Sequence, residues 1–208
     1  MLTSVVETGY QVSELENWKT LHRTLLLDRT PWLRVYEDDL QLPNGDVVEG
    51  YIHLQTPGYA MIVPVNKHGE IGLVRSYKRG VDAVDMQPPA GVLEEDDPLD
   101  TAKRELLEEI GCEAETWIPL GSVVIHGNYG GGKAHFFLAT GCRQVQEPDS
   151  GDLEEQEVIW MPPEQVRHHY QQGDFQQMGA TAALGLAFAN LSTPVSVPDD
   201  IDDGNSDE

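Results

Sequence analysis

After a polar lead-in over residues 1–16, segments rich in apolar residues follow from Trp18 and predict β-structure. The expected strands, rich in aromatic and β-branched side chains, are residues 18–27, 32–40 and 47–54. The segment Pro43-Asn44-Gly45-Asp46 is typical of a hairpin turn between the last two strands. Because Thr56-Pro57-Gly58 then interrupts the pattern, residues 1–57 are predicted to form a small N-terminal β subdomain.

Strands and helices alternate in the rest of the chain. The expected strands are residues 59–65, 70–77, 84–88, 116–126, 133–140 and 157–161, and the expected helices are residues 98–110, 162–171 and 175–191. A glycine-rich segment, residues 126–132, is interpreted as a flexible hairpin connection, with close approach of its backbone to a phosphate as the alternative. The pattern predicts a mixed α/β sandwich over residues 58–192, followed by a disordered acidic tail over 193–208.

The predicted helix 98–110 carries clear signals at both ends. Asp97 is a suitable N-cap, because its carboxylate can accept free backbone N–H groups of the first turn. Pro98 suits the first helical position, where a missing N–H costs nothing. Gly111 suits the left-handed position that ends a helix. We therefore expect this helix to be well defined by its own sequence.

This helix has an acidic face and an apolar face. Glu105, Glu108 and Glu109 are spaced three and four residues apart, so their side chains share one surface. The opposite stripe is apolar: Leu99, Ala102, Leu106 and Ile110. Hard divalent cations such as magnesium prefer carboxylate oxygens at such spacing, and a solvated acidic surface explains the pattern equally well. Arg104, four residues before Glu108, can hold that carboxylate in place.

Composition excludes several classes of function. The formal net charge of −23 argues against unspecific binding to nucleic acid or to an anionic membrane, since both need a cationic surface. The sequence contains neither an apolar run long enough to span a membrane nor a signal peptide, which predicts a cytoplasmic protein. Two cysteines, Cys112 and Cys142, are too few for a disulfide framework or a four-cysteine zinc site.

The segment Arg104-Glu105-Leu106-Leu107-Glu108-Glu109-Ile110-Gly111-Cys112 resembles the second half of the Nudix box, R-E-U-x-E-E-x-G-U with U apolar. The first half of the box fits less closely. Gly91 lies thirteen residues before Arg104 instead of fourteen, and Asp96 stands where the family has glutamate. The chain therefore has a loop shortened by one residue before an intact helical half.

Flanking segments resemble the ADP-ribose pyrophosphatase and nucleoside-diphosphate-sugar hydrolase branch of the Nudix family. They are Leu42-Pro-Asn-Gly45, Val74-Arg-Ser-Tyr-Lys-Arg79 and Gln87-Pro-Pro-Ala-Gly91, the last with Gln87 in place of the branch's glutamate. The resemblance implies a Nudix α/β/α sandwich of mixed sheets. It also implies that the small N-terminal β subdomain over residues 1–57 helps to form a homodimer.

By the same resemblance, the reaction is metal-dependent hydrolysis of the diphosphate bond in an ADP-sugar such as ADP-ribose, giving AMP and a sugar phosphate. The ligands of magnesium, or of manganese, are expected to be the carboxylates of Glu105, Glu108 and Glu109 and the carbonyl of Ala90. Arg104 is expected to orient those carboxylates.

The resemblance also suggests a general base and groups that bind substrate. The acidic loop offers Asp152, Glu154, Glu155 and Glu157 as bases, with Glu154 the first choice, although plain solvated charge remains open for each. Basic side chains are scarce in this chain, so those within residues 74–79 are candidates for binding a phosphate of the substrate. These candidates are Arg75, Lys78 and Arg79. Tyr129 either stacks on a base or is an ordinary surface residue.

Two other functions stay open from the sequence. One is hydrolysis of a different nucleoside diphosphate derivative, because the base and sugar are chosen by loops whose positions the sequence does not give. The other is a non-catalytic nucleotide-binding Nudix domain. Loss of the box glutamates would favour that second function, and all three are present.

Overall fold

The computed structural model describes residues 15–94, 97–151 and 155–191. The chain divides into two compact units. The first comprises residues 1–56 together with 126–131, and the second comprises residues 57–125 and 132–208. The sequence did not predict that residues 126–131 belong to the first unit. These residues are far along the chain from the N-terminal strands that they contact.

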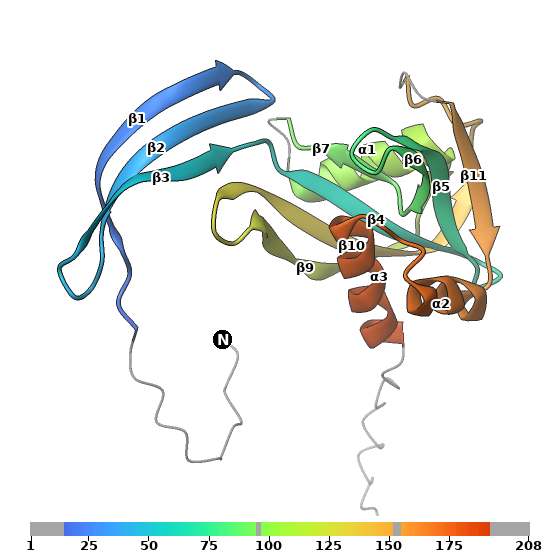
Figure 1. Cartoon of the computed structure of the whole chain (residues 1–208). Coiled ribbons are helices and arrows are strands. Elements are labelled where there is room, and N and C mark those ends of the chain that lie inside the picture. The colour runs from blue at the N-terminus through green and yellow to red at the C-terminus, as the bar shows by residue number, and fades with distance from the viewer. Residues whose placement is uncertain (1–14, 95–96, 152–154, 192–208) are drawn as a thin grey trace, which may run out of the picture. The chain divides into compact units, whose positions relative to one another are not determined.

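The first unit is built on three antiparallel strands, β1 (Lys19–Arg29), β2 (Leu33–Gln41) and β3 (Val47–Gln55), drawn in blue to teal in Figure 1. They agree with the three predicted strands to within two residues. The predicted turn joins β2 to β3, with the N–H of Gly45 donating to the carbonyl of Leu42. Gly45 has a φ of 92°, which is easily reached only by glycine.

A central sheet organises the second unit. Four strands follow one another in it in the order β10 (Gly130–Gln144), β4 (Tyr59–Asn66), β5 (Ile71–Lys78) and β11 (Gln156–Met161). β4 runs parallel to β10, while β5 is antiparallel to both β4 and β11. The remaining strands pair alongside these: β6 (Ala83–Gln87), β7 (Ala90–Val92), β8 (Cys112–Glu113) and β9 (Thr116–His126).

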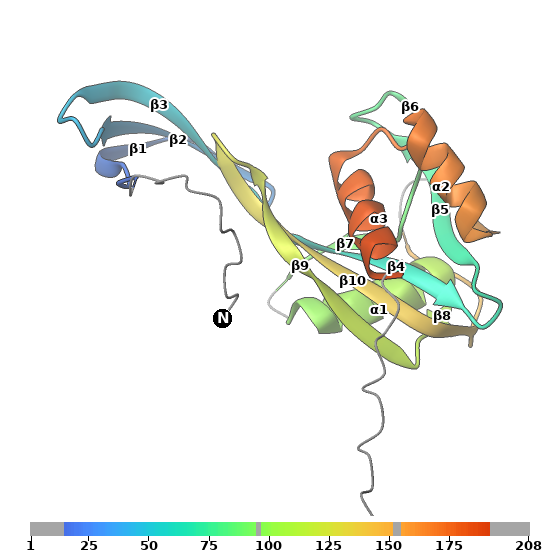
Figure 2. The same ribbon diagram turned by 90° about the horizontal axis from the view of Figure 1, so that it is seen from below.

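Helices cover both faces of this sheet (Figure 2). α1 (Pro98–Ile110) packs with the side chains of Ala60 and Ile62 from β4. The alternate residues of the same strand, Met61 and Val63, pack with α3 (Met178–Leu191) in a second core. Val166 of α2 (Pro163–Gln172) joins that second core. Because neighbouring strand residues point to opposite faces, the fold is a three-layer α/β/α sandwich with a mixed sheet.

The glycine-rich segment agrees with its prediction in part, because residues 127–129 form the turn of the hairpin between β9 and β10. Gly130, Gly131 and Gly132 were expected in a connection, but they form the start of β10. Gly130 pairs with Leu54 of β3 within the first unit, and a Cβ at Gly130 would lie 2.6 Å from the ring of His53. Glycine is therefore required here for close packing between strands.

Several boundaries were also missed. The two- and three-residue strands β7 and β8 carry too few residues to show a period of two, so the sequence did not predict them. α3 begins at Met178 and not at Phe175, whose side chain is buried in the core beside it. The predicted acidic tail lies outside the described residues. No helix within the described part of the chain has the length and apolar character to cross a bilayer.

Candidate functional site

α1 begins and ends where its sequence signals place it. Oδ1 of Asp97 accepts a 2.9 Å hydrogen bond from the N–H of Leu99, and Pro98 occupies the first turn. Gly111 adopts the left-handed conformation with φ 74°, and its N–H donates to the carbonyl of Leu107. A Cβ on Gly111 would lie 2.2 Å from the carbonyl oxygen of Gln146, so the packing of the following loop also requires glycine.

Two of the three glutamates on the acidic face of α1 are buried in the protein, while Glu108 is half-buried. Glu105 is 8% exposed and Glu109 is 4% exposed. Oε2 of Glu109 accepts a 2.7 Å hydrogen bond from the backbone N–H of Ala90 in β7. The carboxylate of Glu105 lies against Gly91, where a Cβ would come within 1.8 Å of Oε1. A plain solvated acidic face is therefore ruled out for these two residues.

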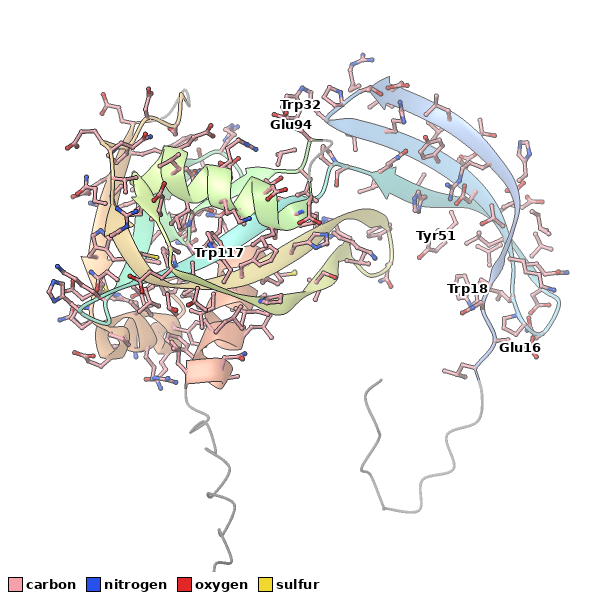
Figure 3. The ribbon with its side chains drawn as sticks, turned by 180° about the vertical axis from the view of Figure 1, so that it is seen from behind. Glu16, Trp18, Trp32, Tyr51, Glu94 and Trp117 are labelled. Atoms are coloured by element: carbon pink, nitrogen blue, oxygen red, sulfur yellow. The ribbon has the colours of Figure 1, made fainter. Side chains whose placement is uncertain are left out.

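Arg104 connects two of the carboxylates. Its Nη1 lies 2.7 Å from Oε1 of Glu105 and 2.9 Å from Oε2 of Glu108. Partial burial of the guanidinium opposes its charge, but the carboxylates of Glu105 and Glu108 outweigh burial and raise the pKa of Arg104 above its ordinary value. Glu94, labelled in Figure 3, adds to this effect. Arg104 therefore stays fully charged and holds two carboxylates at one nitrogen.

The described residues 15–94, 97–151 and 155–191 contain no group of three His, Cys, Asp or Glu side chains arranged to hold a metal ion. Each of the three glutamates contacts another group of the protein. Arg104 engages Glu105 and Glu108, while the N–H of Ala90 engages Glu109. The donor chemistry nevertheless fits a hard divalent cation, because carboxylate oxygens and a backbone carbonyl are the ligands that such ions prefer.

The loop after β10 lies beside the acidic face of α1. The N–H of Asp149 donates a 2.8 Å hydrogen bond to the carbonyl of Glu108. A pocket of about 510 Å³ is lined by Glu109 and by residues of this loop and of β11, including Asp149, Ser150 and Gln156. The structure therefore brings Glu109 and the acidic loop together, which spacing along the sequence could not show. Glu154 and the box position Asp96 lie outside the described residues.

The candidate phosphate-binding residues do not gather in one place. Nη1 of Arg75 lies 3.2 Å from Oε2 of Glu157 on β11 and lines a second pocket. Lys78 ends β5 and is half-buried. Arg79 is exposed in the following turn and pairs with Asp82. Of the three, Arg75 alone lines one of the pockets described here.

Tyr129 lies in the first unit. Its carbonyl accepts the N–H of Leu54, and its ring is exposed. A different pair of aromatic rings in that unit, Trp18 and Tyr51, makes an edge-to-face contact at 6.0 Å (Figure 3). Tyr129 is exposed on the surface, and its predicted stacking on a base stays a hypothesis.

Sequence reasoning passed over Ser76 and Gln156. Ser76 on β5 is buried and faces Gln156 of β11 across the sheet. Gln156 lines both the pocket that contains Glu109 and the pocket that contains Arg75. The only sequence signal was the serine itself, which stands in Val74-Arg-Ser-Tyr where the resembling branch has glutamine. A buried polar residue of this kind is informative only once its neighbours are known.

A model of the NUDIX domain matches residues 55–179, which is more than half of the chain and includes all of α1 and the acidic loop. The chain belongs to the NUDIX family of hydrolases. Enzymes of this family typically depend on a divalent metal ion and bind nucleoside diphosphate compounds. The intact glutamates of α1 agree with membership in the family.

Three named proteins have sequences similar to this Nudix chain. An ADP-ribose pyrophosphatase of Mycobacterium tuberculosis is 27% identical over 168 residues, covering 79% of this chain and 80% of the relative. A methanol dehydrogenase activator of Bacillus methanolicus is 29% identical, covering 61% and 68% of the two chains. An ADP-ribose pyrophosphatase of Bacillus subtilis is also 29% identical, covering 60% and 66%.

The fold has a solved counterpart. A crystal structure described as an ADP compounds hydrolase superposes with a TM-score of 0.73, covering 86% of this chain and 97% of that one. The two sequences are 20% identical, so this likeness concerns the fold. It confirms the predicted Nudix-type α/β/α sandwich.

Proposed function

We propose that this Nudix hydrolase cleaves the diphosphate bond of an ADP-sugar such as ADP-ribose, giving AMP and a sugar phosphate. The observation that carries the proposal is the burial of Glu105 and Glu109 against the Ala90–Gly91 backbone, beside a pocket large enough for a diphosphate. The relatives named ADP-ribose pyrophosphatase support the choice of substrate class.

In this reaction a water oxygen bonds to one phosphorus, and the bond from that phosphorus to the bridging oxygen breaks. The leaving phosphate keeps the bonding electron pair, and the proton of the water passes to a base. Glu154 is our proposed base. The bond from the N–H of Asp149 to the carbonyl of Glu108 supports this choice, because it fixes the start of the acidic loop on α1. Glu155 and Glu157 are the alternatives within the described residues.

Magnesium or manganese is the proposed cofactor, with the carboxylates of Glu105, Glu108 and Glu109 and the carbonyl of Ala90 as ligands. When bound, such an ion neutralises diphosphate charge and lowers the pKa of bound water. The protein holds these groups ready: the N–H of Ala90 fixes Glu109, and Arg104 gathers Glu105 and Glu108. Because Arg104 holds two of the proposed ligands in position, magnesium affinity should fall when Arg104 is replaced.

Arg75, Lys78 and Arg79 are proposed to bind the substrate's phosphates, and Tyr129 its base. Arg75 has the strongest case, because it lines a pocket that shares Gln156 with the pocket at Glu109. Because Gln156 lines both pockets, both lie along the same stretch of β11.

The protein is also proposed to act as a homodimer through its first unit. That unit exposes several large apolar side chains on or beside β1, namely Trp18, Leu21, Leu25, Leu26 and Trp32. Exposed apolar surface of this kind marks association sites. Light scattering coupled to size-exclusion chromatography should give a molar mass of two chains. The Leu25→Glu substitution should lower the measured mass toward that of one chain. A wild-type mass of one chain would reject the dimer.

The reaction is tested by incubating the protein and magnesium with ADP-ribose, other ADP-sugars, UDP-glucose, diadenosine diphosphate and ATP. Release of AMP from ADP-sugars at the highest kcat/KM is the expected result. Faster turnover of another diphosphate would change the substrate class. If the protein binds ADP-ribose in calorimetry and turns over none of the panel, the non-catalytic alternative holds instead.

A further inference from the structure

The side chains of β5 and β11 alternate between the two faces of the central sheet, and the two strands lie side by side (Figure 1). Val74 of β5 pairs with Val158 of β11, and both pack in the core that α1 forms with the sheet. Ser76 and its partner Gln156 stand two residues along from this pair. Their side chains therefore lie on the face of the sheet that α1 covers.

Gln156 lines the pocket of about 510 Å³ that contains Glu109. The same pocket is lined by a second acidic residue, Asp149, and none of its described lining residues is lysine, arginine or histidine. Two lining side chains are neutral hydrogen-bond donors, the amide of Gln156 and the hydroxyl of Ser150. A phosphate beside Glu109 is repelled by the carboxylates, so neutral donors are the side chains of this lining that can hold its oxygens.

Of these two donors, Gln156 is the one fixed by the sheet. It begins β11, which pairs with β5 in an unbroken register, whereas Ser150 lies in the preceding loop. Groups on strands are held more precisely than groups in loops. A glutamine amide has two N–H donors and an oxygen acceptor, so it can contact a phosphate and keep a contact within the protein.

Ser76 supplies a second observation at the same place. It is 2% exposed, and its hydroxyl oxygen has no hydrogen-bond partner among the described residues, which is unfavourable for a buried group. Its cross-strand neighbours are Asp85 on β6 and Gln156 on β11. The oxygens of Asp85 already accept hydrogen bonds, Oδ2 from Gln177 and Oδ1 from the N–H of Met86. The amide oxygen of Gln156 is thus the neighbouring group best suited to accept the Ser76 hydroxyl.

We propose that Nε2 of Gln156 donates a hydrogen bond to a non-bridging phosphate oxygen of the substrate. In this arrangement the Ser76 hydroxyl donates to Oε1 of Gln156 and so turns the N–H end of the amide toward the substrate. Gln156 contacts the substrate, and Ser76 is a positioning residue that acts through it. This inference rests on the proposed function, since it takes the diphosphate to lie beside Glu109.

Gln156→Leu tests the contact with the phosphate, because it removes both donors and keeps a side chain of similar length. The kcat/KM for ADP-ribose should fall about 10- to 100-fold, the effect of losing a hydrogen bond to a charged group. Gln156→Glu should lower it further, since a carboxylate repels the phosphate. Both variants should melt close to the wild-type temperature. Gln165→Leu, at an exposed position on α2, is the matched control. An unchanged kcat/KM in Gln156→Leu would overturn the contact.

Ser76→Ala tests the positioning role. It should lower kcat/KM about threefold to tenfold, and it should cause no further loss when Gln156 is already leucine, because Ser76 acts only through that amide. Thr101→Val is the control. The Thr101 hydroxyl is also buried and without a partner among the described residues, but it lies on α1 and lines none of the three pockets described above. Losses that simply add in the double variant would reject the role of Ser76.

The methylene analogue of ADP-ribose separates this inference from the proposed function, because a CH2 group replaces the bridging oxygen and the analogue is not cleaved. Nuclear magnetic resonance follows the side-chain amide signal of Gln156, which is assigned by its loss in Gln156→Leu. The signal should shift when the analogue and magnesium are added, and it should not move with adenosine, which has no phosphate.

The two proposals then fail in different ways. If the wild-type protein hydrolyses no diphosphate and the Gln156 signal shifts with the analogue alone, the proposed function fails and the contact stands. If the protein hydrolyses ADP-ribose and the analogue leaves the Gln156 signal in place, the contact fails and the proposed function stands. An equal shift with adenosine would also reject a contact with the phosphate.

Discussion

The backbone N–H of Ala90 donates a 2.7 Å hydrogen bond to Oε2 of Glu109, nineteen residues later in the chain. This bond joins the short strand β7 to the last turn of α1. It holds a carboxylate that is almost completely buried, and it leaves the carbonyl of Ala90 on the same stretch of backbone. The bond thus connects the two halves of the Nudix box.

Glu109→Gln tests the proposed role of this carboxylate. The amide oxygen can still accept the N–H of Ala90, so the fold and melting temperature should be kept. Loss of the negative charge should lower kcat by about two to four orders of magnitude, because metal-assisted charge stabilisation supplies several kcal/mol. Steady-state kinetics and circular dichroism measure the two effects. Glu113→Gln, an exposed residue paired with Arg143, is the control. An unchanged kcat in Glu109→Gln would contradict the metal assignment.

Gly91→Ala tests the contact between β7 and Glu105. A Cβ at position 91 would fall within 1.8 Å of the Glu105 carboxylate, so that carboxylate must move. A displacement of about 1 Å in a positioned group can cost about a hundredfold in rate. We expect that loss in kcat/KM for ADP-ribose, together with weaker magnesium binding in calorimetry. Gly127→Ala, where an added Cβ meets no atom within 4 Å, should have wild-type activity.

Arg104→Lys tests the positioning of two carboxylates by one guanidinium. Lysine keeps the charge and loses the planar fork, so Glu105 and Glu108 should be held less firmly. Loss of such a supporting contact typically costs about 10- to 100-fold in metal affinity or activity. A magnesium titration of kcat separates this effect from substrate binding. The neighbouring Lys103→Ala removes only an exposed pair with Asp100 and should leave the titration unchanged.

The Arg23–Asp38 pair should make the first unit sensitive to acid. Two hydrogen bonds from Arg23, at 2.7 and 2.6 Å, lower the pKa of Asp38 below its ordinary value of 3.8. A depressed carboxyl pKa stabilises the folded state above about pH 4, and this stability is lost as the pH falls through the depressed value.

Arg23→Met should therefore destabilise β1 and β2 by about 1–2 kcal/mol at pH 7 and by much less at pH 2. Hydrogen exchange of the amides in these strands measures the difference. Arg34→Met, which removes an exposed pair with Asp28, should have a smaller effect at pH 7. A loss in Arg23→Met that is the same at both pH values would contradict the role of the Asp38 charge.

Much of the molecule could be predicted because its signals are local. The cap at Asp97, the stop at Gly111 and the two faces of α1 each depend on residues within one or two turns of each other. The three N-terminal strands and the hairpin at Gly45 follow from apolar, aromatic and β-branched residues and from a turn sequence. Local spacing fixes such elements, since the backbone geometry of a helix or strand sets which side chains share a face.

Local patterns in the sequence were enough to predict the family, the acidic helix α1 and the sandwich architecture. Tertiary structure alone decided that Glu109 is fixed by Ala90, that Gly130 begins a strand beside Leu54, and that Arg75 pairs with Glu157. The last pair is separated by 82 residues. Such contacts arise from the pairing and register of strands that are distant in sequence, and no local period encodes that register.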